Sequence, residues 1–230
     1  MGDEGTEGIE EQAVPERFAP ERPDGLSLAL NALPFALLAL GAALSVALAD
    51  GAAAVALFLA WLYLVPAALG GLVTRLRPTP TGSFGLDDPG YRHWWLMLQL
   101  QLPFNRLPFL EEALRLVPGL YPAWIRLWGG HLSAQSFVGP GVMIGDRHLI
   151  RVGPRAVLGA RAGFAGHIAF RDAAGRWRVI VAPCAVGADA IVGGDAGMGP
   201  GAVLAPGATL PAARHLGPHK RWPPEKGTEE

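Results

Sequence analysis

The chain has 230 residues, which is enough for one large domain or for one modest domain with an appendage. Half of the residues are hydrophobic and only 17% are charged, a balance typical of a protein that resides in a membrane. A net charge of −1 gives little support to nucleic-acid binding, and a single Cys excludes an intramolecular disulfide, a multi-Cys zinc site and a CxxC redox centre.

The first 25 residues are polar and acidic, without hydrophobic periodicity. Such a segment buries too little apolar surface to offset the entropy of ordering, so residues 1–25 are predicted to form a disordered acidic tail. Their negative charge also argues against a signal peptide, which begins with a positive region.

Two uncharged segments follow, at residues 26–49 and 52–73. At 1.5 Å per residue each helix is long enough to cross about 30 Å of hydrocarbon. The only break is Asp50-Gly51, which predicts a tight two-helix transmembrane hairpin at residues 26–74. A buried core hairpin is the alternative. It is disfavoured because two adjacent apolar segments of this length rarely fit inside a globule of 230 residues.

Arg75 and Arg77 directly follow the second apolar segment. By the positive-inside rule they place this end in the cytoplasm, and a hairpin returns the chain to the side from which it entered. The sequence therefore predicts a multi-pass protein of the cytoplasmic (inner) membrane, with both termini in the cytoplasm. Membrane lipid is its expected partner.

Residues 75–130 are predicted to form a linker and short amphipathic helices. Pro78 and Pro80 end the second apolar helix, and further prolines interrupt the segment at residues 91–128. This segment is rich in Leu, Arg and Trp, a composition typical of helices that lie at the headgroups. Its Trp residues are Trp94, Trp95, Trp124 and Trp128. Ordinary packing against a protein core is the alternative.

A six-residue period dominates the rest of the chain. The first run holds Leu132, Val138 and Ile144 and, after a two-residue slip, Val152, Leu158 and Phe164; the second holds Ile180, Val186, Val192, Met198, Leu204 and Leu210. A small residue stands four positions after most of these anchors, and Gly follows many of them directly.

A period of six fits neither an α-helix nor a hairpin sheet, but it fits a β-solenoid with short flat faces. The anchor points into a narrow core, the small residue shares that core, and Gly lets the backbone turn the corners. The fold class predicted is thus a membrane α-helical hairpin followed by an all-β solenoid at residues 131–213. Residues 214–230 are predicted to be a C-terminal tail.

The repeats VGPGVMIG from Val138 and VGPRAVLG from Val152, with the run up to Leu210, resemble the hexapeptide-repeat acyltransferases. The chain is similar to membrane-attached members, such as the C-terminal region of poly-ε-lysine synthetase-like proteins. In those proteins aromatic segments lead into the solenoid, as residues 121–132 do here. The resemblance covers residues 91–222. It implies a left-handed parallel β-helix, a homotrimer, and acyl transfer from acyl-CoA or acyl carrier protein.

The resemblance also implies a site. Gly166-His167 ends the first run, directly before an interruption at residues 170–179, and the family shows the same order. His167 is therefore the expected general base, because an imidazole of near-neutral pKa accepts protons readily. Asp172 is the expected acidic partner that orients it. A structural or solvated His167 is the alternative.

A cluster near the end of the chain is the candidate site for the donor's CoA phosphates and adenine. It consists of His219, Lys220, Arg221 and Trp222, which offer cations and an aromatic ring. No His-x4-His pair is present, so no metal site is predicted and a metal-dependent hydratase is disfavoured. The expected function is a membrane-anchored acyltransferase that modifies a hydroxyl or amine of an amphipathic or lipid-linked acceptor. The alternative is a non-catalytic trimeric scaffold that recruits a partner to the membrane.

Overall fold

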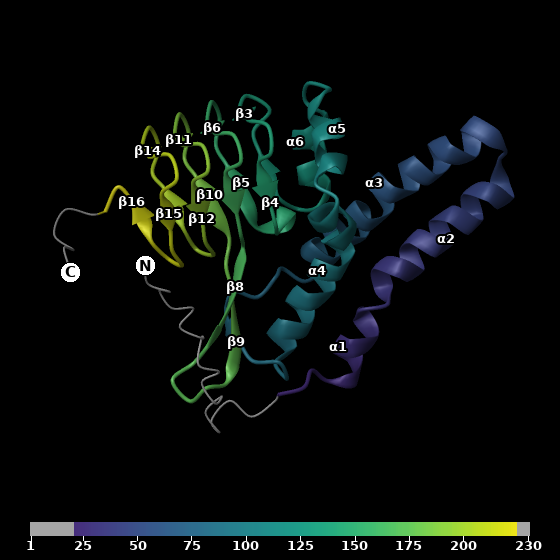
Figure 1. The fold of residues 1–230 in the computed structure, drawn as a ribbon, viewed down its shortest axis with the longest axis horizontal. Coiled ribbons are helices and arrows are strands. Elements are labelled where there is room, and N and C mark those ends of the chain that lie inside the picture. The colour runs from purple at the N-terminus through teal and green to yellow at the C-terminus, as the bar shows by residue number, and fades with distance from the viewer. Residues whose placement is uncertain (1–20, 225–230) are drawn as a thin grey trace, which may run out of the picture.

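The computed structural model describes residues 21–224, so most of the predicted acidic tail lies outside the described residues. Helices make up the N-terminal half and a stack of short parallel strands the C-terminal half (Figure 1). The helices gather at the end of the stack where its first coil lies. A long helical hairpin projects from them, away from the coils (Figure 1).

The hairpin consists of three helices: α1 (Gly25–Leu30), α2 (Leu33–Leu48) and α3 (Gly51–Leu76). Asp24 caps α1 by accepting a hydrogen bond from the Ser27 N–H at 2.7 Å. Trp61 joins α2 to α3, because its indole N–H donates to the carbonyl of Leu37 at 2.9 Å.

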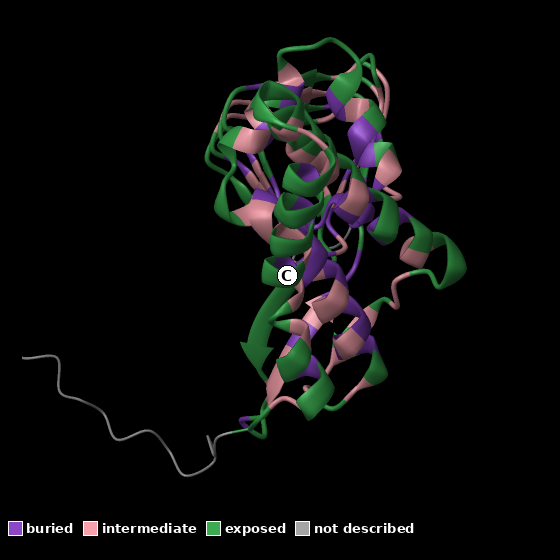
Figure 2. Ribbon diagram, turned by 90° about the vertical axis from the view of Figure 1, so that its right-hand side faces the viewer, coloured by how far each residue is buried: buried purple, intermediate pink, exposed green. Residues whose placement is uncertain are grey.

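Two spans, Gly25–Leu48 and Gly51–Leu76, are long and apolar enough to cross a membrane, and only 17% of each is buried. Their large side chains therefore face outward, as Phe35 (71% exposed), Val46 and Leu48 do. Figure 2, which looks at the helical side of the molecule, shows exposed and intermediate residues over much of the nearest helices.

Three further helices connect the hairpin to the strands: α4 (Pro89–Arg106), α5 (Phe109–Arg115) and α6 (Leu120–Leu127). Pro103 lies inside α4 instead of ending it. The expected headgroup position of the Trp residues is wrong for Trp94, Trp124 and Trp128, which are buried. Trp128 packs against α3 because α3 presents Gly70 and Gly71 at the contact, so that the Trp128 ring and the Leu127 carbonyl approach its backbone directly. Trp124 donates its indole N–H to the Tyr63 carbonyl of α3, and Trp94 packs in the aromatic cluster described below.

The predicted solenoid is confirmed as a parallel β-helix. Its three sheets have the strand orders β16-β13-β10-β5-β2, β14-β11-β6-β3 and β15-β12-β7-β4, and neighbouring strands within each are parallel. The strands are β2 (His131–Leu132), β3 (Phe137–Val138), β4 (Met143–Ile144), β5 (Ile150–Val152), β6 (Val157–Leu158), β7 (Gly163–Phe164), β10 (Cys184–Val186), β11 (Ile191–Val192), β12 (Gly197–Met198), β13 (Val203–Leu204), β14 (Thr209–Leu210), β15 (His215–Leu216) and β16 (Arg221–Trp222). The left-handed sense of the winding stays an expectation from the resemblance.

The six-residue period is explained by the core of this β-helix. Anchors such as Leu158 and Leu204 are fully buried, and so are small residues such as Ala190 and Ala202. The corners are tight: a Cβ on Gly193 would lie 2.4 Å from the Ala212 nitrogen of the next coil. A glycine is required there because no side chain fits.

The β-helix extends further than predicted. Strands β15 and β16 pair with β12 and β13, so residues 215–222 belong to the stack and not to a tail. Leu216 and Trp222 continue the spacing of six beyond Leu210, and they supply the inward side chains of the last turn.

The interruption between the two runs is an antiparallel hairpin, formed by β8 (His167–Arg171) and β9 (Trp177–Val181). Strand β1 (Gly82–Phe84), from the segment after the helical hairpin, pairs with the outer edge of β9. The three strands form a small sheet beside the β-helix. An aromatic cluster covers it, which includes Tyr91 and Trp94 of α4 together with Trp177.

Candidate active site

His167 occupies the point where the chain leaves the β-helix, as the first residue of β8. Its Nδ1 lies 2.7 Å from Oδ2 of Asp146, while 27% of its side chain remains exposed. The Asp146 side chain is fully buried. The pair therefore combines an accessible imidazole with a carboxylate shielded from water.

The fold fixes this pair through strand register. Strand β4 pairs with β7 so that Ile144 lies opposite Phe164, and two residues further on Asp146 reaches Gly166. The N–H of Gly166 donates to Asp146 Oδ2 at 2.8 Å, the same oxygen that receives His167. A Cβ on Gly166 would lie 2.9 Å from the Cβ of Asp146, so the Gly-His pair admits the carboxylate only because the first residue is Gly.

Trp94 of α4 forms the other wall of the site. Its ring centroid lies 4.8 Å from that of His167, with the two planes inclined at 53°. Trp94 itself is 3% exposed and belongs to the aromatic cluster over the small sheet. The imidazole is thus held between the Asp146 carboxylate, which comes from the first coil, and helix α4, which packs on the small sheet of β1, β8 and β9.

Each member of the pair favours the charged form of the other, which shifts both pKa values. Burial lowers the pKa of His167, but the hydrogen bond and charge of Asp146 outweigh this effect and the net pKa is raised. Burial likewise raises the pKa of Asp146, and the hydrogen bond from His167 outweighs it, so the net pKa is lowered. Asp146 is therefore ionised at neutral pH, and His167 is a stronger base than a free imidazole.

A buried polar layer supports Asp146 from behind. The amide of Gln101 accepts from the Arg147 N–H at 2.7 Å and lies 3.3 Å from Nδ1 of His148. His148 is fully buried, and burial lowers its pKa to about 4, so it is neutral. Arg147, also buried, pairs with Glu111 of α5. These contacts hold the residues directly after Asp146 against the helices.

Asp172 does not reach His167. It lies at the far end of the β8–β9 hairpin, five residues along a strand that rises about 3.3 Å per residue. Its carboxylate instead pairs with Arg176 at 3.0 Å and Arg178 at 3.4 Å. Asp146 takes the place expected for Asp172, because stacking of coils brings together residues that are 21 positions apart.

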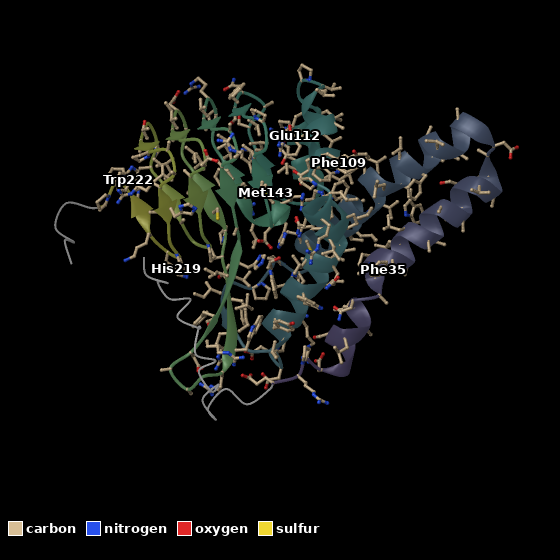
Figure 3. The ribbon with its side chains drawn as sticks, viewed as in Figure 1. Phe35, Phe109, Glu112, Met143, His219 and Trp222 are labelled. Carbon is tan, nitrogen blue, oxygen red and sulfur yellow. The ribbon has the colours of Figure 1, made fainter. Side chains whose placement is uncertain are left out.

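The four predicted donor-binding residues lie together in the last coil, and Figure 3 shows His219 and Trp222 at the end of the β-helix away from the helices. Their strand β16 is two strands beyond β10, or roughly 10 Å along the stack. Arg214 covers one face of the Trp222 ring at 4.2 Å, and the Trp222 N–H donates to the Thr209 carbonyl. The structure does not bring this cluster to His167 within one chain.

Cys184 lies behind the site and is buried. Its Sγ contacts the carbonyls of Ala165 and Gly199 at 3.1 and 3.0 Å. Burial raises the pKa of the thiol to about 12, which keeps it protonated and makes it a poor nucleophile. Among residues 21–224 no group of three or more His, Cys, Asp or Glu residues is arranged to hold a metal ion.

No protein-family model matches the chain, and no curated protein sequence matches it. Several solved structures resemble it. A maltose O-acetyltransferase from Clostridium difficile is 14% identical with a TM-score of 0.41, over 64% of this chain and 86% of that one. The hexapeptide-repeat acetyltransferase VCA0836 from Vibrio cholerae, complexed with acetyl coenzyme A, is 18% identical with a TM-score of 0.33, over 52% and 84%.

A serine acetyltransferase from Neisseria gonorrhoeae, in complex with serine, is 16% identical with a TM-score of 0.23, over 80% of this chain and 92% of that one. At these identities and TM-scores the likenesses carry no conclusion about chemistry.

Proposed function

We propose that the chain is a membrane-anchored acyltransferase with His167 as its general base and Asp146 as the residue that orients it. The donor is a thioester of CoA or of acyl carrier protein, and the acceptor is a hydroxyl or amine on an amphipathic or lipid-linked molecule. The observation that carries the proposal is the 2.7 Å contact between a partly exposed imidazole and a fully buried carboxylate.

The pairing defines which nitrogen does the chemistry. An ionised carboxylate only accepts hydrogen bonds, so the His167 Nδ1 carries the proton that it donates to Asp146. The lone pair of Nε2 is then free for a substrate. Trp94 limits the imidazole on one side and so restricts its rotation.

The proposed step conserves atoms and charge. Nε2 of His167 accepts the proton of the acceptor hydroxyl or amine as its oxygen or nitrogen bonds to the thioester carbonyl carbon. The tetrahedral intermediate then expels sulfur, the C–S bond breaks, and the imidazolium returns its proton to the thiolate. The products are an ester or amide and a free thiol. Asp146 stabilises the imidazolium between the two proton transfers.

We propose a homotrimer in which the donor lies in a groove between subunits. This arrangement is consistent with the distance between His167 and the cluster of His219, Lys220, Arg221 and Trp222 in the last coil. In this arrangement the cluster contacts the donor's phosphates and adenine.

Membrane attachment is supported by the outward apolar faces of α2 and α3. A second apolar band lies at the same end of the β-helix, around α5; it comprises Leu107, Phe109, Leu116, Val117 and Leu120, all exposed. We propose that the bilayer lies against this end, with the hairpin inserted and both of its ends on one face, which Arg75 and Arg77 identify as cytoplasmic.

The test is release of free thiol from a panel of acyl-CoAs by the full chain in neutral detergent, with a cell lipid extract as acceptor. His167→Ala should lower turnover by about 10²–10⁴-fold, the contribution of a positioned base. The matched control is His215→Ala, an exposed histidine on β15. Equal rates for wild type and H167A would refute the proposal, and thiol release absent from both would favour the scaffold.

A further inference from the structure

A cavity of about 470 Å³ lies at the base of the hairpin, between α1, the C-terminal end of α3 and the start of α4. This base groove has walls made mainly of aliphatic side chains. They are Leu26, Leu30, Val73, Leu76 and Leu96. The volume is within the range of small-molecule sites, about 300–1,000 Å³.

The groove is held open by bonds between its walls. Trp95 of α4 donates its indole N–H to the carbonyl of Ser27 in α1 at 3.0 Å. Arg92 of α4 pairs with Asp24, the cap of α1, at 2.6 Å. Helix α1 therefore stands at a fixed distance from α4, and the space between them does not depend on a flexible loop.

Positive charge lies at one end of the groove. Arg77 lines it, is exposed, and has no ion pair within the part of the chain that the structure describes. Arg92 also lines it, with its charge largely matched by Asp24. His93 is there too, bonded to Thr79 Oγ1 at 3.1 Å; burial and the charge of Arg77 lower its pKa, so it is neutral. Arg77 thus supplies the uncompensated charge.

We propose that the base groove binds one molecule of an anionic phospholipid, with an acyl chain along the leucine walls and the phosphate at Arg77. The charge sign selects an anion, and the aliphatic walls select an anion that carries hydrocarbon over a free phosphate. On α3 the exposed Leu72 lies one turn before Leu76 of the groove, so the groove opens toward the apolar surface of the hairpin, from which a lipid enters.

The inference rests on the membrane attachment proposed above, but not on acyl transfer. Its location relates it to the candidate active site, because His93 in the groove and Trp94 against His167 are consecutive residues of α4. A lipid in the groove therefore contacts the same turn of helix that forms one wall of the His167 site.

The test measures retained lipid. Full-length protein in neutral detergent is incubated with equal amounts of palmitoyl-oleoyl phosphatidylglycerol and phosphatidylcholine, purified again, and its bound lipid is quantified by mass spectrometry. Wild type should retain about one phosphatidylglycerol per chain. Arg77→Gln should lower the preference for phosphatidylglycerol about five-fold, the usual effect of one Arg near a membrane surface. Arg75→Gln, which removes the same charge two residues away and outside the groove, should leave it unchanged.

A second pair of variants tests the apolar walls. Leu30→Trp fills the groove and should abolish specific retention, whereas Leu28→Trp, on the exposed face of α1, should not. Equal losses in R77Q and R75Q, or full retention in L30W, would overturn the proposal. So would displacement of the lipid by 10 mM inorganic phosphate, which would indicate a plain anion site. Thiol release is assayed on the same samples, so failure of the acyltransferase proposal is seen separately.

Discussion

The substitution Asp146→Asn isolates the role of the buried carboxylate. It keeps the size and shape of the side chain but replaces an acceptor-only group by an amide with a donor nitrogen. In the wild type, Oδ2 of Asp146 accepts hydrogen bonds from both the Gly166 N–H and the His167 Nδ1–H. In the variant an amide oxygen at this position can accept from both donors but carries no negative charge to stabilise the imidazolium, and in the other amide orientation an N–H faces Nδ1 of His167 and reverses its tautomer.

The expected effect on rate is a loss of about 10²-fold or more in kcat, up to the 10⁴-fold limit set by loss of the base itself. The pH profile gives the more specific result. Activity requires neutral His167, whose pKa lies above its ordinary value of 6.5 because of Asp146. In the variant burial is unopposed and lowers this pKa, so the rise of kcat/KM with pH should move to lower pH.

Stability provides an independent measurement. The raised pKa of His167 means that its contribution to stability is present below pH 6.5 and is lost as pH rises through the folded pKa. The lowered pKa of Asp146 means that its contribution is present above pH 3.8 and is lost as pH falls through the folded pKa. The pair therefore stabilises the fold most between about pH 3.8 and 6.5. When the melting temperature is measured against pH, the wild type should show this stabilisation and D146N should not.

The matched control is Asp172→Asn, the same chemical change at the far end of the β8–β9 hairpin. Its carboxylate pairs with Arg176 and Arg178, and such screened surface pairs add little to stability. We expect no shift in the pH profile of D172N. If D146N retains the wild-type profile, or if D172N shifts it equally, the assignment of Asp146 as the orienting residue is refuted.

Three further predictions concern packing and topology. Cys184→Ala should keep full activity, lose about 1 kcal/mol or less of stability, and show that the buried thiol is not a nucleophile, as measured by thermal melting and thiol release. Gly71→Ala places a Cβ 1.9 Å from the Leu127 carbonyl and should cost about 1–3 kcal/mol in a melt, whereas Gly25→Ala, with nothing within 4 Å, should be neutral. A reporter enzyme fused after Glu230 should lie in the cytoplasm, so a reporter that works only there should be active. Activity of a reporter that works only outside the cytoplasm would contradict a hairpin with both ends on the cytoplasmic face.

The β-helix could be predicted from sequence because its core is one-dimensional. Each inward side chain recurs at a fixed spacing, and the same arithmetic applied to Leu216 and Trp222 would have found the last strands. The positions of the Trp residues are harder to predict from sequence. A helix that carries Trp and Arg is equally suited to a membrane surface and to a protein surface, and for Trp128 it is Gly70 on α3 that makes room for the ring against the protein.

The partner of His167 could not be read from local sequence, because Asp146 lies one coil earlier and meets Gly166 only through strand register. A signal was nevertheless present. The spacing of six slips by two residues between Ile144 and Val152, and Asp146 lies inside that slip. Where the regular spacing breaks, the residues are not all needed to fill the core, so a polar side chain such as Asp146 can be placed there for another role.

The β8–β9 hairpin interrupts the chain but not the sheets, since β5 pairs with β10, β6 with β11 and β7 with β12 across it. The two halves of the β-helix are thus joined by hydrogen bonds on all three faces in addition to one covalent connection. The exposed residues Ala173 and Ala174, in the turn of that connection, are consequently a place where the polypeptide is expected to tolerate a cut or an inserted tag. Two fragments that end and begin there carry complementary sheet edges, and they provide the means to assemble this molecule from separately expressed parts.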